Sequence, residues 1–275
     1  YDAGISKRCH PWYIGGAASL FGHVAPKVRS ARILEIGCAS GHNLLAIAAS
    51  LPDAVCVGVD ISSKQIQRAQ RDAAALGLDH VAFIAADVMS IKGELGGFDY
   101  IISHGVYSWV PDAVRDGLFE LCADLLAPGG LLYMSYNTMP GWADYGLMRA
   151  LVKRLAPGEA WSSELNARVD AWVDALPEGS TRKRYEQLWR HGFRDLPEFY
   201  KRHGVFAEFN EPRYVNEVAR HAAESGLDYV SDLSLKLDLP TAAYRDVVDR
   251  SQHLTRLEQL QMLDFAQHTT FRASV

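Results

Sequence analysis

The 275-residue sequence has few cysteines, no long hydrophobic run and no excess of positive charge. Its cysteines, Cys9, Cys38, Cys56 and Cys122, are too sparse for a disulfide scaffold and lack a CxxC spacing. We therefore expect reduced thiols in a cytoplasmic protein. Since HExxH and clustered Cys/His motifs are also missing, we expect no metal site. The most apolar stretch, 44–61, is broken by charged residues and a proline, which argues against membrane insertion.

The charge balance is slightly acidic. Lysine and arginine total 28 against 33 aspartates and glutamates, which gives a net charge of −5. This balance argues against a nucleic-acid partner, because binding to phosphate backbones requires a basic surface. Hydrophobic residues at 48% and charged residues at 22% are typical of a globular protein. The length fits one enlarged domain or two domains.

Short apolar runs alternate with segments of helical periodicity in the first 136 residues. The expected strands are 32–36, 55–59, 81–85, 100–102 and 131–136, and the expected helices between them are 43–51, 63–76 and 113–126. Strands joined by helices form parallel sheets through right-handed crossovers. The sequence therefore predicts an α/β fold with helices on both faces of the sheet, and Pro128-Gly129-Gly130 predicts the turn into the fifth strand.

The later part of the sequence predicts helical additions to this sheet. We expect three parts, 1–136 as an N-terminal cap and ligand-binding core, 137–210 as a helical insertion and lid, and 211–275 as the rest of the core with a second helical insertion at 242–267. The expected elements are amphipathic helices at 146–155, 164–176 and 182–189, a helix at 213–225, and strands at 227–233 and 271–275. Segment 182–202 has seven basic and three acidic residues, which indicates a solvated helical face or a docking surface for an acidic partner.

The most informative stretch, 33–43, reads Ile-Leu-Glu-Ile-Gly-Cys-Ala-Ser-Gly-His-Asn. Gly37 follows the expected strand and Gly41 opens the next helix, so the backbone can turn sharply and approach a ligand closely. A dinucleotide fingerprint GxGxxG would need glycines where Ala39 and His42 stand. Glu35 would repel a pyrophosphate but suits a cationic amino-acid group. The alternative is an ordinary strand-to-helix turn.

Two further acids stand at the ends of the second and third expected strands. Asp60 can accept hydrogen bonds from both hydroxyls of a ribose, and Asp87 can accept one from the amine of adenine. Either residue has the alternative role of a helix cap. Because the carboxyl ends of neighbouring parallel strands meet at one edge, we expect these acids and Glu35 to line a common crevice.

With these residues in this order, the sequence resembles the class I S-adenosylmethionine-dependent methyltransferases. The resemblance implies a Rossmann-like, mostly parallel sheet with a terminal antiparallel strand, and S-adenosyl-L-methionine as cofactor. It also implies that the first loop holds the methionine part, Asp60 the ribose and Asp87 the adenine. The cofactor-binding residues implied are Glu35, Gly37, Ala39, Gly41, Asn43, Asp60, Ile61, Gln65, Asp87, Val88 and Ser103.

Segments 98–111 and 135–142 narrow the resemblance. They lack Asn-Pro-Pro-Tyr and are similar to bacterial methyltransferases that carry a methyltransferase regulatory domain, a group that includes protein-lysine methyltransferases. The similarity continues at 210–212, 226–229 and 271–272, whereas the N-terminal segment keeps only His10-Pro11 of the longer family motif. A protein lysine amine is the favoured acceptor. A small metabolite as acceptor and a non-catalytic cofactor-binding or partner-binding module stay open as alternatives.

Methyl transfer needs an aligned, neutral nucleophile more than strong acid or base chemistry. A free lysine is mostly protonated at neutral pH, so a nearby acceptor must help to remove its proton. We expect His104 and Tyr107, just after the fourth strand, to be catalytic. The expected substrate-binding residues are Trp109, Tyr136, Asn137 and Trp142. The alternatives are a purely structural histidine and aromatic residues that only close the core.

Overall fold

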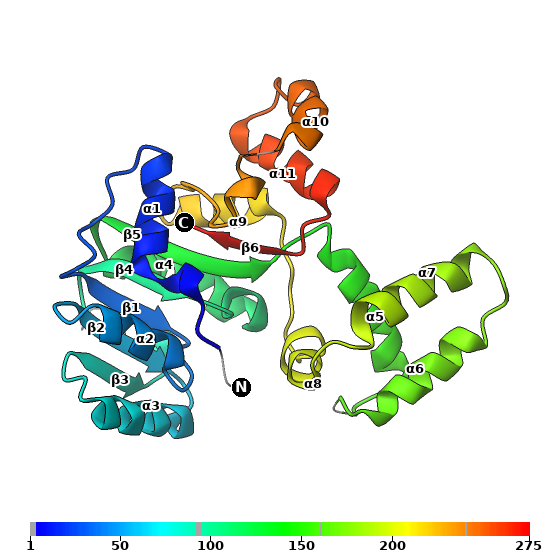
Figure 1. Ribbon diagram of the computed structural model, residues 1–275, viewed down its shortest axis with the longest axis horizontal. Coiled ribbons are helices and arrows are strands. Elements are labelled where there is room, and N and C mark those ends of the chain that lie inside the picture. Colours follow the sequence, from blue (N-terminus) through cyan, green and yellow to red (C-terminus); the bar gives the residue numbers. More distant parts are fainter. Residues whose placement is uncertain (1–3, 92–94, 160, 240) are drawn as a thin grey trace.

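The computed structural model describes residues 4–91, 95–159, 161–239 and 241–275, which include a six-stranded sheet in the order β3-β2-β1-β4-β5-β6 (Figure 1). The strands are β1 (Arg32–Ile36), β2 (Val55–Asp60), β3 (Val81–Ala85), β4 (Phe98–Ser103), β5 (Leu126–Asn137) and β6 (Phe271–Ser274). The pairs among β1 to β5 are parallel, and β6 is antiparallel to β5. The predicted mostly parallel sheet with a terminal antiparallel strand is confirmed.

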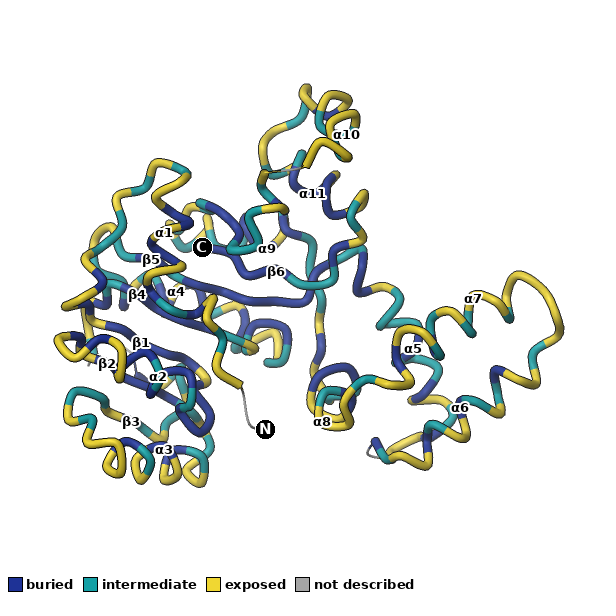
Figure 2. Tube along the Cα trace, viewed as in Figure 1, coloured by how far each residue is buried: buried dark blue, intermediate teal, exposed yellow. Residues whose placement is uncertain are grey.

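Helices cover both faces of this sheet, because side chains along each strand alternate between two apolar clusters. In β1, Ile33 belongs to the cluster under α1 (Pro11–Leu20), α2 (His42–Ser50) and α3 (Ser63–Leu76). Leu34 and Ile36 belong to the cluster under α4 (Asp112–Leu125) and α9 (Val215–Glu224). The strands β1, β2 and β4 are consequently buried along most of their length, whereas in the edge strand β3 only Phe83 is buried (Figure 2).

The expected boundaries of β1, β3 and α3 agree with the structure, whereas β5 begins earlier than expected. Pro128-Gly129-Gly130 lies inside β5 and does not precede it. Gly129 has a φ of +77° and the register with β4 shifts between Phe98 and Tyr100. The glycine thus permits an irregularity within the strand, where we had expected a turn.

The strand expected at 227–233 does not form as a continuous strand. The Leu233 amide donates to the Ala273 carbonyl at 2.9 Å, and the Val275 amide donates to the Ser231 carbonyl at 2.8 Å. Between them, however, the Asp232 side chain accepts from the backbone amides of Ser234 and Ala273. The Asp232 side chain thus accepts from a backbone amide of β6 that a regular strand would pair with a carbonyl. Between these segments, only an isolated bridge of Asp232 with Ser274 is assigned.

Segment 142–206 forms a helical unit with its own apolar cluster, including Met148, Val169 and Trp189. Figure 1 shows this unit beyond the carboxyl ends of β4 and β5. Its elements are α5 (Trp142–Leu155), α6 (Glu164–Asp174), α7 (Ser180–Leu188), α8 (Glu198–Tyr200) and π-helical turns at Trp189–Phe193 and Lys201–Val205.

The basic residues of this helical unit are largely paired with acids on the same unit. Arg182 contacts Asp174, Glu178 and Glu186 within 3.5 Å, and Arg190 contacts Asp174 at 2.5 Å. These partners neutralise much of the charge counted along 182–202. Of the two alternatives, the pairing favours the solvated helical face over a docking surface for an acidic partner.

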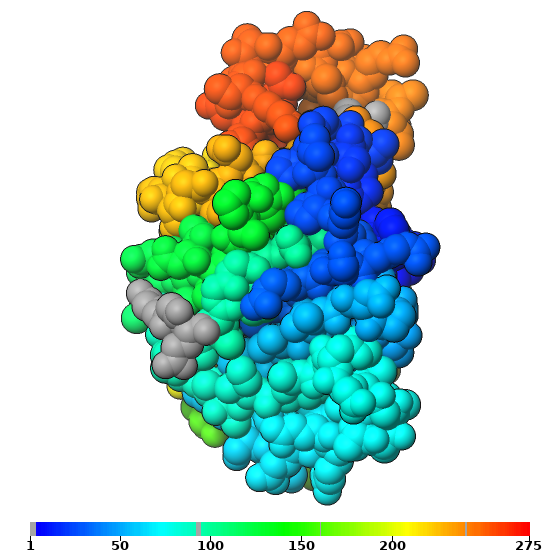
Figure 3. All heavy atoms as spheres, turned by 90° about the vertical axis from the view of Figure 1, so that its left-hand side faces the viewer, coloured from blue at the N-terminus to red at the C-terminus, as the bar shows by residue number. Residues whose placement is uncertain are grey.

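A second helical region, α10 (Arg245–Arg250) and α11 (Arg256–Gln267), packs beside the sheet edge. The Arg256 guanidinium lies 5.0 Å from the ring centroid of Phe21, which joins this region to the end of α1. Figure 3 shows the C-terminal helical region, in orange, lying against the N-terminal segment, in blue. The remaining short elements are 3-10 turns at Lys7–Cys9, Val88–Ser90, Tyr107–Trp109, Leu235–Leu237 and Ala242–Tyr244. Within the described ranges, no helix combines the length and the hydropathy that crossing a membrane requires.

Candidate cofactor and active site

The loop after β1 makes three left-handed backbone turns, with φ of +70° at Gly37, +47° at Ala39 and +74° at Gly41. A Cβ on Gly37 would lie 2.6 Å from the Val106 side chain, and one on Gly41 would lie 2.6 Å from the Phe83 ring. Both positions therefore require glycine for conformation and for space. The loop is packed closely against β3 and the segment after β4, which fixes its shape next to the carboxyl edge of the sheet.

Glu35 is the buried acid of this edge. Its Oε1 accepts a 2.8 Å hydrogen bond from Asn43 Nδ2, whereas Oε2 is buried and receives no hydrogen bond from any described residue. Burial raises the pKa of Glu35 to about 7, although Asn43 and the Leu44 amide oppose the rise. An open carboxylate oxygen in a buried place is stabilised when a ligand donates to it. We call Glu35 and Asn43 the half-filled acceptor site, because Asn43 donates to one oxygen of the Glu35 carboxylate and no described residue donates to the other.

Asp60 fastens the loop to the end of β2. Its Oδ2 accepts from the Ala39 amide at 2.9 Å, and its Oδ1 accepts from the Ser62 amide at 2.8 Å. The cap of α3 is Ser62, whose hydroxyl accepts from the Gln65 amide, so Asp60 is not the capping residue. Each carboxylate oxygen keeps a second lone pair, which a ribose hydroxyl can use.

Asp87 is exposed and does cap a short helix. Its Oδ1 accepts from the Met89 amide at 3.0 Å at the start of the 3-10 turn Val88–Ser90. The capping alternative is thus realised at Asp87, whose side chain is exposed as a whole. Since β3, β2 and β1 are neighbours in that order, the structure brings Asp87, Asp60 and Glu35 to one edge of the sheet.

The other expected cofactor residues differ in exposure. Ile61 is 78% exposed, Gln65 and Val88 are half-buried, and Ser103 is fully buried. The Ser103 hydroxyl receives no partner from the described residues. An exposed isoleucine beside Asp60 is available to a flat ring, and the unpaired hydroxyl lies at the end of β4, next to β1.

His104 follows β4 at the same edge. Its Nδ1 lies 2.8 Å from the Tyr133 hydroxyl and 3.2 Å from the Ser135 hydroxyl, which also accepts from the Gly105 amide. Burial, with a smaller effect of Arg8, lowers the pKa of His104, so the ring is neutral at pH 7. A ring fixed through Nδ1 leaves Nε2 as the nitrogen that can serve a ligand.

Tyr107 does not join His104. Its ring packs in the apolar cluster under α4, 5.4 Å from the Phe119 ring, and its hydroxyl lies 3.0 Å from His221 Nδ1 on α9. The phenol that we expected to accept a proton therefore has a partner on the far face of the sheet. The 3-10 turn Tyr107–Trp109 directs this side chain into the core.

The expected aromatic walls are mostly interior. Trp142 is buried and stacks on Tyr145 with ring centroids 4.3 Å apart, and the Tyr136 hydroxyl lies 3.0 Å from Ser274 Oγ. Trp109 is half-buried and donates from Nε1 to the Gly204 carbonyl at 3.4 Å. Of these three residues, only Trp109 is partly accessible.

Asn137 has a positioning role that the sequence did not reveal. Its side-chain amide donates to Asn210 Oδ1 at 3.0 Å, and Asn210 in turn donates to the Gly204 carbonyl at 2.8 Å. The two asparagines thereby join the end of β5 to the return of the helical unit. Their separation by 73 residues explains why no local pattern indicates the contact.

Arg115 is a second residue that sequence analysis missed. It is buried in α4, donates from Nε to the Tyr107 carbonyl at 3.0 Å and donates from Nη2 to the Val110 carbonyl at 2.9 Å. It thereby fixes the loop that follows His104. A usable signal exists, because Arg115 stands three and four residues before Leu118 and Phe119 on the apolar face of α4.

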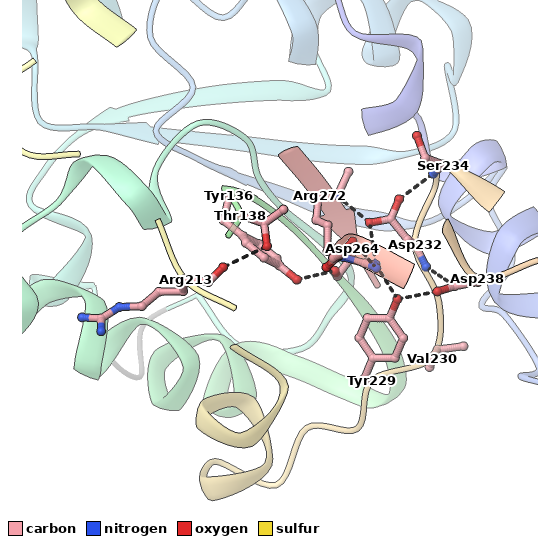
Figure 4. Close-up of polar contacts among 12 residues, drawn as sticks. Tyr136, Thr138, Arg213, Tyr229, Val230, Asp232, Ser234, Asp238, Asp264 and Arg272 are labelled. Atoms are coloured by element: carbon pink, nitrogen blue, oxygen red, sulfur yellow. Dashed lines mark hydrogen bonds and ion pairs between the residues drawn. The ribbon is translucent and has the colours of Figure 1, made fainter. Parts of the chain in front are cut away.

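A group of buried polar side chains, here the Arg272 cluster, joins β6, α11 and segment 229–238 (Figure 4). Arg272 donates to both carboxylate oxygens of Asp264, at 2.9 and 3.0 Å, and lies 3.6 Å from Asp232. Tyr229 and Asp238 complete the cluster through a 2.8 Å hydrogen bond. Arg272, Asp264 and Asp232 have no exposed surface, so ligands cannot reach this cluster.

Comparisons with known proteins bear directly on this arrangement. Residues 33–130 match the model of a methyltransferase domain, and residues 198–275 match that of a predicted methyltransferase regulatory domain. The uncharacterized protein RP789 of Rickettsia prowazekii is 31% identical, over 97% of this chain and 49% of its own length. The chain belongs to the class I methyltransferases that carry this regulatory domain. It spans about half the length of the curated relatives that it matches over most of its sequence.

Two solved structures extend the comparison for this methyltransferase. PKMT2 from Rickettsia typhi superposes with a TM-score of 0.86 at 25% identity, over 100% of this chain and 53% of that chain. The same protein in complex with AdoHcy, S-adenosylhomocysteine, gives 0.85 at 26% identity, over 100% of this chain and 54% of that chain. The cofactor of the family, S-adenosylmethionine, fits the edge described above. Glu35 offers an open acceptor to an ammonium group, and Gly37 and Gly41 let the backbone approach it closely.

Proposed function

We propose that this methyltransferase transfers the methyl group of S-adenosylmethionine to a lysine side-chain amine of a protein. The observation that carries the proposal is the likeness to PKMT2, a name that denotes a protein lysine methyltransferase, over the whole length of the chain. The likeness includes the helical additions as well as the sheet. It therefore supports a shared class of acceptor better than a match to the sheet alone would.

His104 is the proposed proton acceptor in this reaction. When bound, S-adenosylmethionine supplies an electrophilic methyl group. The acceptor amine must lose a proton to attack it, and a neutral imidazole at the carboxyl edge can take that proton through Nε2. Tyr133 and Ser135 orient the ring through Nδ1. Tyr107 has no part in this proposal, because its hydroxyl meets His221.

The helical unit 142–206 is the proposed lid over the acceptor. Two backbone hydrogen bonds tie its stem together, from Met139 to the Arg213 carbonyl and from Arg213 to the Asn137 carbonyl, both at 3.1 Å. Trp109 meets the unit at Gly204. A unit with its own core on a narrow stem can exclude water without disturbing the sheet. A cytoplasmic location and an acceptor other than nucleic acid belong to the same proposal.

Labelled S-adenosylmethionine tests the acceptor class. The protein is incubated with the labelled cofactor and with separate protein and metabolite fractions of a bacterial lysate, and labelled protein is then hydrolysed to amino acids. We expect the label in methylated lysine. Label confined to metabolites would assign a small-molecule acceptor instead. Binding of S-adenosylhomocysteine without any transfer would identify a non-catalytic module.

A substitution tests the role of His104. His104→Ala should lower kcat by about 100-fold or more, which is the usual contribution of a general base, while calorimetry should show unchanged affinity for S-adenosylhomocysteine. The exposed His253 is the matched control, and His253→Ala should keep full activity. An active His104→Ala variant would remove this residue from the mechanism.

A further inference from the structure

Two charged groups beside the loop after β1 have no partner of opposite charge in the described ranges. One is Glu35, whose Oε2 is open. The other is Arg8, which is exposed and forms no ion pair or hydrogen bond with a described residue. Many other arginines on the surface do form such pairs, for example Arg182 and Arg190. An unpaired cation and an unpaired carboxylate near one site indicate a ligand that carries both charges.

The backbone holds Arg8 in place from both sides. On one side the Ser6 amide donates to Asn43 Oδ1 at 3.2 Å, and Asn43 also donates to Glu35. On the other side Cys9 is fully buried, and His10 Nε2 lies 2.8 Å from Ser50 Oγ. The 3-10 turn Lys7–Cys9 is thereby held along α2, between a contact at the start of the helix, where Asn43 meets Glu35, and a contact at its last residue, Ser50. Arg8 is exposed but does not lie on a free tail.

The surroundings of Arg8 also include the end of β4. Cys9, the neighbour of Arg8, belongs to the same buried cluster as Tyr133, whose hydroxyl lies 2.8 Å from His104 Nδ1. The charge of Arg8 also helps to lower the pKa of His104. The strands β1 and β4 are neighbours, and Ile36 of β1 lies opposite Ser103 of β4. Glu35 precedes Ile36 and His104 follows Ser103, so these two residues lie at adjacent strand ends. The segment that carries Arg8 therefore lies beside both the half-filled acceptor site and the residues that hold the proposed proton acceptor.

We propose that Arg8 binds the carboxylate of the amino-acid part of S-adenosylmethionine. This part carries one ammonium and one carboxylate group, and the site presents one open carboxylate oxygen and one unpaired guanidinium. An arginine can bind a carboxylate with two parallel hydrogen bonds, which a lysine cannot do. The short segment before α1 thus takes part in cofactor binding. The inference rests on the cofactor of the proposed function but not on its acceptor.

Calorimetry with three ligands distinguishes a contact to the carboxylate from contacts to the ammonium group and to the nucleoside. S-adenosylhomocysteine carries both charges, its decarboxylated form keeps only the amine, and 5′-methylthioadenosine lacks the whole amino-acid part. We expect Arg8→Ala to weaken binding of S-adenosylhomocysteine about tenfold, the scale of one charge-assisted contact near solvent. Binding of the other two ligands should change less than twofold. The exposed neighbour Lys7 supplies the control, since Lys7→Ala should leave all three affinities unchanged.

Several results would overturn the inference. Unchanged affinity for S-adenosylhomocysteine in Arg8→Ala would show that the guanidinium makes no contact. Equal weakening of all three ligands would show that Arg8 only supports the fold of its segment, and an equal effect of Lys7→Ala would indicate general electrostatics. If the wild-type protein binds S-adenosylhomocysteine but transfers no methyl group, the proposed function fails while the Arg8 contact can still be established.

Discussion

The cofactor edge and the Arg272 cluster both bury carboxylates, but they differ in how the acceptor oxygens are used. Burial raises the pKa of Glu35 and of Asp232 to about 7 in each case. Asp232 accepts from two backbone amides and lies beside Arg272, whereas one oxygen of Glu35 accepts no hydrogen bond from the described part of the chain. A raised pKa therefore does not distinguish a binding site from a structural cluster here. What distinguishes the binding site is the carboxylate oxygen that has no hydrogen-bond partner among the described residues.

The largest expected effect comes from breaking the closed cluster. Arg272→Met should lower the free energy of unfolding by about 3–5 kcal/mol, because two buried carboxylates lose their cation. Urea unfolding followed by circular dichroism measures this change. Arg250 is exposed on α10, and Arg250→Met should cost under about 0.5 kcal/mol.

A second substitution sharpens this result. Adding Asp264→Asn to Arg272→Met removes one of the orphaned charges, so the double variant should recover at least about 1 kcal/mol of stability. A single variant as stable as the wild-type protein, or a double variant less stable than the single one, would contradict the view of a closed, charge-balanced cluster.

The next effect concerns the open carboxylate. Glu35→Gln should weaken binding of S-adenosylhomocysteine by about 1.5–3 kcal/mol, since an ammonium group loses a charged acceptor in a buried place. The unfolding free energy should not fall, because a buried charge has been removed. Glu120 on α4 is exposed, and Glu120→Gln is the control. If Glu35→Gln lost much stability and bound S-adenosylhomocysteine as before, Glu35 would have a structural role like that of the Arg272 cluster, and the comparison would fail.

A smaller effect is expected at Asp60. Asp60→Ala removes the acceptor for the Ala39 and Ser62 amides and one set of lone pairs for the ribose, so binding should weaken by about 1–2 kcal/mol. Both S-adenosylhomocysteine and 5′-methylthioadenosine should show this loss in calorimetry, since both contain the ribose. Loss confined to the first ligand would point to the amino-acid part instead.

The smallest expected effect is the pH dependence of binding. The pKa of Glu35 is raised to about 7 in the free protein, and the ionised form binds an ammonium group. Affinity for S-adenosylhomocysteine should therefore rise about three- to tenfold from pH 6 to pH 8 and then level off. The stability of the free protein should move the opposite way, because a folded-state pKa above the unfolded one makes stability fall as pH rises from 4.5 to 7. Glu35→Gln should abolish the dependence of binding, and a flat profile in the wild-type protein would contradict it.

Much of the sheet follows from local sequence patterns. The apolar runs at β1 and β3 and the periodicity of α3 depend on neighbouring residues only, and their bounds agree with the structure. Segment 227–233 has a similar apolar character, yet Asp232 turns inward to bond the Ala273 amide, 41 residues away. Periodicity contains no information about such a partner.

The same limit applies to the site. Glu35, Asp60 and Asp87 were found because each ends an expected strand, and parallel strands share their carboxyl edge. Tyr107 also follows a strand, but a 3-10 turn and the distant His221 direct it into the core. Asn137, Arg115 and Arg8 acquire their contacts or surroundings only when segments far apart in the sequence come together.

The sequence by itself determined the order of strands and helices, the glycine loop and the row of acids, because periodicity, glycine and strand ends act within a few residues. Tertiary structure decided which of these polar groups have partners. It closed the Arg272 cluster from segments about 40 residues apart and, among the residues that the structure describes, left Glu35 Oε2 without a hydrogen-bond donor. Hydrogen bonds in a protein interior depend on atoms brought together by folding, so the chemistry of the site was fixed there.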